Sequence, residues 1–362
     1  MLAIVLGTRP EIIKCAPIIH EAMARDLPVS IIHTGQHYTP ELDEIFFRTL
    51  RLPEPRMNLH VGSSDPIKQI TTMMQGLQPA FARVQPSAVL VQGDTNSVLA
   101  GALVAHKMNI PIAHLEAGLR SDDWSMPEEG NRVITGMLAE LHFCPTDLQR
   151  RRLGVEGIVE GVHVVGNTIV DAVQHYADQP ISPGFFEKFG IEPGRYILLT
   201  MHRPSNVDDP DRLRRLLECL TRAAETLGTR FLFPVHPRTE ARIRSVGLWE
   251  TYEQGPSFIL TKPLGYIELL QLQKHARAVL TDSGGIQEEA NILHVPCLTL
   301  RSNTERPETI EAGGNILFYE TNPAALVSSI RELEARPRTW PCPFGDGKTA
   351  KRVLDILLTK KF

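Results

Sequence analysis

The sequence lacks the marks by which several common classes of protein are recognised. Its five cysteines are scattered, without a CxxC pair or a Cys/His zinc spacing, so neither a disulfide framework nor a metal site is indicated. No stretch approaches the ~18 apolar residues that a membrane-spanning helix needs. The net charge of −4 argues against a general nucleic-acid-binding protein, which would be basic. We therefore expect no metal, and neither a membrane nor a nucleic acid as a partner.

The beginning of the sequence also lacks two familiar signals. The apolar run Leu2–Leu6 is too short for a signal peptide and is followed by Gly-Thr-Arg-Pro, so we expect a cytoplasmic protein. The turn after this run is not GxGxxG, which leaves a nicotinamide or flavin dinucleotide site unsupported. We expect no bound cofactor.

Strand-like and helix-like segments alternate along the 362 residues, a length that suggests two domains. Alternation of this kind predicts parallel, doubly wound sheets. The pattern breaks at 179–184 and then restarts, so we place the hinge near Gly166-Asn167 and predict domains 1–166 and 167–349. The predicted strands are 2–6, 29–33, 88–91, 110–114, 141–144, 162–165, 196–200, 230–234, 257–260, 276–280 and 295–300.

A glycine pair follows the predicted strand at 276–280. Asp282-Ser283-Gly284-Gly285 reads as a turn, and a helix begins directly after it. Adjacent glycines let backbone N–H groups approach a ligand, and a helix N-terminus adds unpaired donors and a positive dipole end. Ser283 can cap the helix or donate its hydroxyl to the same anion. The segment predicts a phosphate site, with an ordinary strand–turn–helix joint as the alternative.

Charged and polar side chains collect at the ends of predicted strands, where doubly wound sheets bind ligands. The second half would supply a phosphate cradle and the first half three carboxylates, whose repulsion raises at least one pKa and can separate acid from base roles. The alternative is that each carboxylate caps a helix or pairs with an arginine. These residues are Arg9, Lys14, Asp94, Glu116 and Glu128 in the first half, and His202, His236, Ser283, Glu289 and Arg306 in the second.

Short motifs along the whole chain closely resemble those of the non-hydrolysing UDP-N-acetylglucosamine 2-epimerases. The resemblance implies an α/β, GT-B-like fold with two doubly wound parallel-sheet (Rossmann-like) domains, an interdomain cleft, and a final helix, 350–362, that packs back on the first domain. It also implies a homodimer. The motifs are GTRPE at 7–11 with Lys14, QGDT at 92–95, HLEAGLR at 114–120, PEEGNR at 127–132, VGNT at 165–168, HRPSN at 202–206, PVHP at 234–237, TDSGGIQEEA at 281–290 and TERPE at 304–308.

The same resemblance implies a reaction, the reversible C2 epimerisation of UDP-N-acetylglucosamine to UDP-N-acetylmannosamine without NAD or metal. A base removes the C2 proton while UDP leaves C1, which gives 2-acetamidoglucal, and UDP adds back after a proton arrives on the opposite face. A desolvated carboxylate suits the weakly acidic C2–H, and cationic and N–H donors suit the charge that the leaving diphosphate gains. The product would supply surface polysaccharide synthesis.

Matched residue by residue, the family pattern implies a role for each member of the site. Asp94 and Glu128 are the expected acid/base pair, Glu116 orients the sugar or assists proton transfer, and His202 stabilises the leaving diphosphate. The expected substrate-binding residues are Arg9, Lys14, Arg132, His236, Leu264, Leu269, Ser283, Gly284, Gly285, Glu289 and Arg306. Within this set, Glu289 would accept the ribose hydroxyls, and the two leucines would lie beside the uracil.

Two stretches depart from the family pattern. Met201-His202-Arg203-Pro204 stands where bacterial members often have Gly-His-Arg, so we expect a different loop shape. Many members carry Gln-His-Arg after the second strand and an arginine on the next helix, which help hold a second, activating substrate molecule. Here Tyr38 follows Gln36-His37, and Met73 stands near the helix position. We therefore expect substrate activation to be weak or absent.

Three other functions stay open on the sequence. A hydrolysing epimerase would release N-acetylmannosamine and UDP, although its relatives resemble this chain less in SGGIQEE. A GT-B glycosyltransferase would need an acceptor groove, and three carboxylates fit elimination better. A nucleotide-sugar sensor would have no need of Asp94 and Glu128. The sugar is open as well, because a 3-substituted or C6-oxidised relative of the same UDP-sugar could fit.

Overall fold

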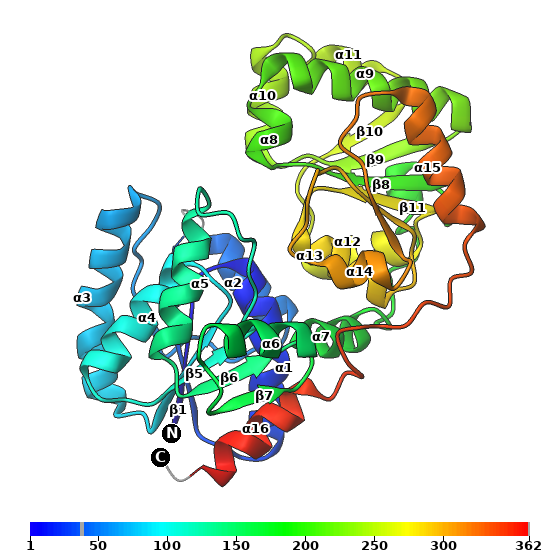
Figure 1. Ribbon diagram of the computed structural model, residues 1–362. Coiled ribbons are helices and arrows are strands. Elements are labelled where there is room, and N and C mark those ends of the chain that lie inside the picture. The colour runs from blue at the N-terminus through cyan, green and yellow to red at the C-terminus, as the bar shows by residue number, and fades with distance from the viewer. Residues whose placement is uncertain (37–39, 361–362) are drawn as a thin grey trace. The chain divides into compact units, whose positions relative to one another are not determined.

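The computed structural model describes residues 1–36 and 40–360, which fold into two compact units (Figure 1). Unit 1 comprises Met1–Gln174 and Phe344–Phe362, and unit 2 comprises His175–Pro343. The chain passes from unit 1 to unit 2 within helix α7 (Thr168–Tyr176) and returns at Phe344. The sequence analysis places these two crossings after 166 and after 349.

Unit 1 is built on a seven-stranded sheet in which every described strand pair is parallel. The strand order β3-β2-β1-β4-β5-β6-β7 reverses direction between β1 and β4, which defines a topological switch point. The strands are β1 (Leu2–Leu6), β2 (Val29–His33), β3 (Met57–Asn58), β4 (Ala88–Gln92), β5 (Ile112–Leu115), β6 (Leu141–Cys144) and β7 (Val162–Val164).

The helices of unit 1 cover both faces of this sheet. The C-terminal helix, red in Figure 1, packs against the first helix, blue, and Arg25 forms an ion pair with Asp355 at 2.6 Å. Proline at the start of the first helix and a Thr8–Glu11 capping box explain why this helix begins directly after β1. The helices are α1 (Arg9–Ala24), α2 (Pro40–Thr49), α3 (Pro66–Val84), α4 (Asn96–Lys107), α5 (Pro127–Leu138), α6 (Asp147–Val155), the part of α7 up to Gln174, and α16 (Thr349–Thr359).

Unit 2 repeats the same plan with a six-stranded sheet of order β10-β9-β8-β11-β12-β13, and all its described strand pairs are parallel. Its switch point lies between β8 and β11. The strands are β8 (Tyr196–Thr200), β9 (Arg230–Pro234), β10 (Phe258–Thr261), β11 (Ala278–Thr281), β12 (Cys297–Thr299) and β13 (Asn315–Leu317). The helices are η1 (Glu187–Phe189), α8 (Pro204–Val207), α9 (Pro210–Leu227), α10 (Pro237–Ser245), α11 (Trp249–Gln254), α12 (Tyr266–Lys274), α13 (Gly284–Ile292), α14 (Pro307–Glu311) and α15 (Pro323–Ala335).

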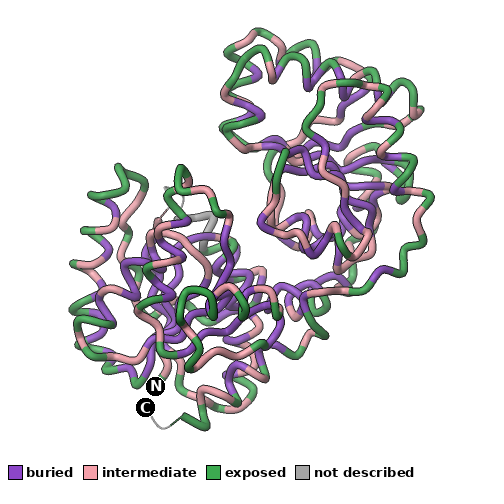
Figure 2. Tube along the Cα trace, viewed as in Figure 1, coloured by how far each residue is buried: buried purple, intermediate pink, exposed green. Residues whose placement is uncertain are grey.

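Side chains of the central strands alternate between two apolar cores. In β8, Ile197 and Leu199 join the core beneath α9 and α15, whereas Tyr196 and Leu198 join the core beneath α12 and α13. Burying an aliphatic or aromatic side chain contributes about 1.5–3 kcal/mol, so both faces of each sheet favour apolar residues. This explains why the strands appear in the sequence as continuous apolar runs, and the runs are buried in both units (Figure 2).

The predicted pair of doubly wound parallel sheets is confirmed. The prediction that a strand starts at 110 is wrong, because Asn109 has φ +56° and the N–H of Ile110 bonds to the Ala105 carbonyl, which closes α4 instead. The short strands β3 and β13 were missed, since two or three residues show no periodicity. Among residues 1–36 and 40–360, no helix combines the length and the apolar character needed to cross a membrane.

Candidate active site

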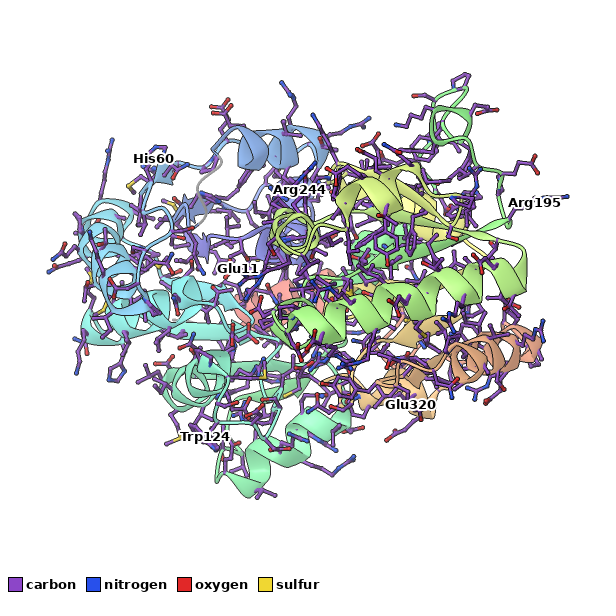
Figure 3. All side chains as sticks on the ribbon, turned by 90° about the horizontal axis from the view of Figure 1, so that it is seen from above. Glu11, His60, Trp124, Arg195, Arg244 and Glu320 are labelled. Carbon is purple, nitrogen blue, oxygen red and sulfur yellow. The ribbon has the colours of Figure 1, made fainter. Side chains whose placement is uncertain are left out.

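The loops after β1 and β4 meet at the switch point of unit 1, and the buried carboxylate of Glu11 joins them. It accepts hydrogen bonds from the N–H groups of Gly7 and Thr8, at 2.8 and 2.7 Å, and from the Thr95 hydroxyl at 2.6 Å. Burial outweighs these hydrogen bonds and raises the pKa of Glu11 to about 7. Figure 3 shows Glu11 among crowded side chains. The loop that carries Asp94 is thereby tied to the start of α1.

Glu116, which follows β5, is buried and held from three directions. Lys14 Nζ lies 2.6 Å from its Oε1, Asn167 Nδ2 donates to the same oxygen at 2.8 Å, and Gln92 donates to Oε2. Its backbone has φ +64°, a conformation that is uncommon outside glycine and that concentrates at functional sites. Removing one partner of a buried ion pair is costly, so Lys14 and Glu116 depend on each other for their positions.

Asp94 follows β4, is half-buried, and pairs with an arginine from α5. Arg132 approaches one Asp94 oxygen with Nε at 2.8 Å and Nη2 at 2.6 Å. Its Nη1 lies 2.5 Å from the buried carboxylate of Glu129, which also accepts from the N–H and the hydroxyl of Ser121 at 3.0 and 2.9 Å. Asn131 donates to the Asp94 carbonyl at 2.9 Å. Helix α5 therefore fixes both the backbone and the carboxylate of Asp94.

Glu128 and Arg9 occupy the first turns of α5 and α1. Glu128 is exposed, and it precedes Arg132 by four residues, so the two side chains share a face of α5. Arg9 is half-buried, with its guanidinium carbon 5.4 Å from the centre of the Phe46 ring. Both side chains are accessible to a ligand, in contrast with the buried Glu116.

In unit 2, the fully buried Asp282 joins the loops after β8 and β11. It accepts from the N–H groups of His202 and Arg203 at 3.0 and 2.9 Å and from the Asn206 amide at 3.1 Å, and His202 Nδ1 lies 3.2 Å from its other oxygen. Burial alone would raise the pKa of Asp282, but the hydrogen bonds and the charge of His202 outweigh it and lower the pKa. With Nδ1 directed at Asp282, His202 presents Nε2 to a ligand.

A second histidine stands at the end of the neighbouring strand β9. His236 occupies the N-cap position of α10, and its Nδ1 accepts from the N–H of Arg238 at 3.2 Å. The rings of His202 and His236 lie 5.4 Å apart, centre to centre. Two imidazoles therefore share the carboxyl edge of the unit 2 sheet.

Helix α13 begins immediately after β11, and its N-terminus is open. Ser283 occupies the N-cap position without a side-chain cap bond, and its own N–H is bonded to the Thr281 hydroxyl at 3.0 Å. A Cβ built on Gly284 or Gly285 would meet no heavy atom of the described residues within 4 Å. The first N–H groups of the helix are thus accessible, and this terminus has the properties of an anion site.

Arg306 lies in the segment after β12, at the N-cap position of α14. Its Nε pairs with the buried carboxylate of Glu288 on α13, and Nη1 donates to the Glu305 carbonyl at 3.2 Å. The pairing anchors the loop after β12 to the helix that carries the glycine pair.

The residues matched to the nucleoside lie along α12 and α13. Glu289 is buried on α13, where Gln273 Nε2 donates to it at 2.5 Å. Leu264 and Leu269 are half-buried against the core that α12 and α13 cover. Each lies within one turn of the start of α12.

Within each unit, the structure brings predicted residues together in pairs. Lys14 meets Glu116 and Arg132 meets Asp94 in unit 1, and the two histidines meet in unit 2. Sequence analysis assigned no catalytic or binding role to the residues that hold them in place, although all of these except Gln273, which lies within α12, belong to one of the quoted motifs. The residues missed in this way are Glu11, Gln92, Glu129, Asn167, Asp282 and Gln273.

The structure describes only some of the residues at which the chain departs from the family's second-substrate pattern. His37 and Tyr38 lie outside the described residues, whereas Met73 is fully buried in the core of unit 1. In the described part of the chain, no group of three or more His, Cys, Asp and Glu side chains is arranged to hold a metal ion.

Fold and site together define a class of protein, a GT-B-like enzyme with two Rossmann-like units, one presenting carboxylates at its strand ends and the other an open helix N-terminus. The chain belongs to the UDP-N-acetylglucosamine 2-epimerase family, whose family model matches residues 21–358, and this is a family of isomerases. The UDP-N-acetylglucosamine 2-epimerase of Methanocaldococcus jannaschii is 44% identical over 365 residues, covering 100% of both chains. The UDP-2,3-diacetamido-2,3-dideoxy-D-glucuronate 2-epimerase of Pseudomonas aeruginosa is 34% identical over 359 residues, covering 98% of both.

Solved structures confirm the predicted GT-B-like fold. The crystal structure of the Methanocaldococcus jannaschii enzyme in complex with UDP-GlcNAc and UDP matches with a TM-score of 0.91, at 44% identity and with 99% of both chains covered. The glycotransferase of kitacinnamycin matches with a TM-score of 0.61 at 14% identity, covering 99% of this chain and 98% of that one, which supports the fold alone.

Proposed function

We propose that this enzyme interconverts UDP-N-acetylglucosamine and UDP-N-acetylmannosamine by eliminating UDP and adding it back. The observation that carries the proposal is the Asp94–Arg132 pair at the switch point of unit 1, in a chain 44% identical from end to end to a UDP-N-acetylglucosamine 2-epimerase. A relative of this similarity has been crystallised with UDP-GlcNAc and UDP, and the helix terminus in unit 2 suits the diphosphate that both ligands carry.

The diphosphate binds at the N-terminus of α13. The N–H groups of Gly284 and Gly285 and the Ser283 hydroxyl approach its oxygens, because the glycines leave the terminus open. His202, oriented by Asp282, donates through Nε2 to the oxygen that gains charge as UDP leaves C1. His236 and Arg306 add donors and positive charge to the same anion, and Arg9 is a further expected ligand of the substrate.

The nucleoside binds along α12 and α13. Glu289, positioned by Gln273, accepts hydrogen bonds from the ribose. Leu264 and Leu269 lie beside the uracil. Unit 2 thus supplies the UDP affinity, while the chemistry at the sugar belongs to unit 1.

Asp94 and Glu128 serve as the acid/base pair for the two faces of C2. Arg132 holds Asp94, and Glu128 lies one helical turn before Arg132, so the same face of α5 organises both carboxylates. Glu116, fixed by Lys14, orients the sugar or assists proton transfer. Arg132 therefore acts on the substrate through Asp94 in this scheme.

The bond changes balance without an oxidant or a reductant. The base takes the C2 proton, the C–H electron pair becomes the C1–C2 double bond of 2-acetamidoglucal, and the C1–O bond breaks with its electrons on UDP. Addition reverses each step with the proton delivered to the opposite face of C2. We therefore propose that the reaction proceeds without NAD and without a metal ion.

The oligomeric state and the cellular role of the enzyme are also part of the proposal. We propose a cytoplasmic homodimer whose product feeds surface polysaccharide synthesis, which the motif resemblance to the family supports. Light scattering of the purified protein tests the dimer, because a monomer's mass would contradict it.

A second substrate has specific support from the relative that acts on a diacetamido-glucuronate. That enzyme is 34% identical over nearly the whole chain, so a 3-acetamido or C6-oxidised UDP-sugar is a direct competitor for the assignment. Parallel assays with both UDP-sugars decide between them, since the true substrate should show the higher kcat/KM.

The decisive experiment is incubation with UDP-N-acetylglucosamine in deuterated water, followed by NMR. Elimination and re-addition place deuterium at C2 of both epimers, while free UDP accumulates only slowly. Stoichiometric release of UDP with free N-acetylmannosamine would instead identify a hydrolysing epimerase. Recovery of unlabelled substrate, with no epimer, would contradict the epimerase proposal.

A further inference from the structure

Asn167 lies directly before α7, the helix along which the chain passes from unit 1 to unit 2. Its side-chain amide donates to Glu116 Oε1 at 2.8 Å, and its backbone N–H donates to the Phe344 carbonyl at 2.8 Å. Phe344 is the residue at which the chain re-enters unit 1. One residue therefore joins a carboxylate of the candidate site to both places where the chain crosses between the units.

The position of Asn167 is closely fixed. It is 1% exposed, and its Oδ1 accepts from the N–H of Ile169 at 3.1 Å, as an N-cap residue does for the first turn of a helix. Gly166 before it has φ +95°, and a Cβ there would lie 2.9 Å from the Phe344 carbonyl oxygen. The two ends of one planar amide thus bond to α7 and to Glu116, so a change in the direction of α7 alters the bond to Glu116.

The other end of α7 is held by α12 within unit 2. Tyr176, the last residue of α7, packs edge to face against Tyr266, with the ring centres 6.0 Å apart. The Ala177 carbonyl accepts from Lys274 Nζ at 2.9 Å and from Gln271 Nε2 at 3.1 Å, and both donors belong to α12. A helix of nine residues therefore connects α12 to the amide that holds the carboxylate in unit 1.

We propose that Asn167 is a positioning residue that couples the placement of Glu116 to α12 through α7, so that nucleotide binding along α12 is communicated to the sugar site. This inference rests on the UDP-sugar function proposed above. Residues at the ends of elements absorb the change when a ligand shifts one part of a protein relative to another, and packed elements carry the coupling. The coupling makes the chemistry at the sugar depend on an occupied nucleotide site.

The first test, Asn167→Asp, keeps the oxygen that caps α7 but replaces the donor to Glu116 by a second carboxylate. We expect kcat to fall about tenfold or more, with UDP affinity unchanged in calorimetry. One of two adjacent carboxylates takes up a proton more readily than a single one and can then donate, so the ratio of variant to wild-type kcat should recover from about pH 8 to about pH 5. Lys14, Cys15 and His114 also interact electrostatically with this carboxylate, but both enzymes contain them, so the ratio isolates the substituted group.

The second test is a double-mutant cycle along α7. Lys274→Met removes a donor that α12 gives to the Ala177 carbonyl and should lower kcat about three- to tenfold, with UDP affinity near the wild-type value. Combined with Asn167→Asp, it should cause no further loss, because the connection is already broken. Lys188→Met is the matched control, since Lys188 pairs with Glu268 of the same helix at 2.6 Å, and it should leave kcat unchanged in either background.

Three results would overturn the inference. They are a wild-type kcat in Asn167→Asp, a loss in that variant that is the same at every pH, and a double variant whose kcat falls by the product of the two single losses. A wild-type kcat in Lys274→Met would contradict the coupling through α7 in the same way. A wild-type enzyme that does not convert UDP-N-acetylglucosamine would instead contradict the proposed function, so the two failures are distinguishable.

Discussion

Both units bury a carboxylate beneath two consecutive N–H groups of the loop after the first central strand, but the carboxylates come from different places. In unit 1, Glu11 belongs to the helix that follows the loop and bridges to Thr95, after the neighbouring strand. In unit 2, Asp282 comes from the neighbouring strand and accepts from His202 and Arg203. Two copies of one sheet plan thus join the same two loops in opposite directions.

The difference decides what each unit presents to a ligand. In unit 1, Thr95 caps α4 through its side chain, and Asp94 stands at the strand end as an acidic group. In unit 2, Asp282 is withdrawn into the interior, so the glycine pair at the start of α13 stays open and His202 faces outward. In the proposed function, unit 1 contributes carboxylates for proton transfer and unit 2 contributes donors for an anion.

The largest expected effect separates catalysis from binding. Asp94→Asn and Glu128→Gln should each lower turnover by about 10²–10⁴-fold, the contribution of a positioned acid or base, because an amide cannot accept the C2 proton. UDP affinity should stay near the wild-type value, since unit 2 supplies it. NMR assays of epimerisation and calorimetry with UDP measure the two effects. Near-normal turnover in either variant would remove that residue from its assigned role.

The second largest expected effects come from substituting one glycine in each unit. Alanine at Gly7 would place a Cβ 2.0 Å from the Thr34 hydroxyl and 2.2 Å from the Ser97 hydroxyl, so Gly7→Ala should destabilise the fold by about 3 kcal/mol. Gly285 has open space and no positive φ, so Gly285→Ala should fold normally and bind UDP about tenfold more weakly, because the Cβ blocks the helix terminus. Urea unfolding and calorimetry measure the two changes. Equal UDP affinity in Gly285→Ala would argue against this terminus as the diphosphate site.

The fold could be predicted from the sequence, whereas only some of the site residues could. Strands buried on both faces need continuous apolar runs, and both sheets were predicted from these runs. Asp94 and Glu116 were found because they follow such runs. Glu11 was overlooked because an acidic residue in the first turn of a helix is common for local reasons, namely the helix dipole. The pairing of Lys14 with Glu116 joins positions 102 residues apart, which no local pattern can show.

The two buried carboxylates, Glu11 and Asp282, should also make the stability of the fold depend on pH in two different ranges. Glu11 has a folded-state pKa of about 7, raised from 4.5, so the folded state keeps a proton that the unfolded chain releases between these values. Stability from this group is present below pH 4.5 and is lost as the pH rises through 7. As the pH rises from 5 to 8, the free energy of unfolding of Glu11→Gln, measured with urea, should therefore fall by about 2 kcal/mol less than that of the wild type.

Asp282→Asn is the matched variant in unit 2. The pKa of Asp282 is lowered below 3.8 in the folded state, so its contribution is present above that value and is lost as the pH falls through the folded-state pKa. Asp282→Asn should therefore alter the slope of stability in acid, below the pH range in which Glu11→Gln acts. An identical pH slope for Glu11→Gln and the wild type would contradict the account given for unit 1.

The smallest expected effect concerns whether unit 1 also holds a second UDP-sugar. A second diphosphate would need cationic donors, but the edge beyond β2 carries amides that bond one another: Gln69 donates to the Gln36 carbonyl at 3.2 Å and accepts from Asn96 at 2.8 Å. Met73 is fully buried and offers no charge. Initial rates should therefore follow a hyperbola in UDP-N-acetylglucosamine, and the reverse reaction should proceed without added UDP-N-acetylglucosamine. A sigmoidal curve that a trace of this substrate abolishes would show that unit 1, like unit 2, binds a diphosphate.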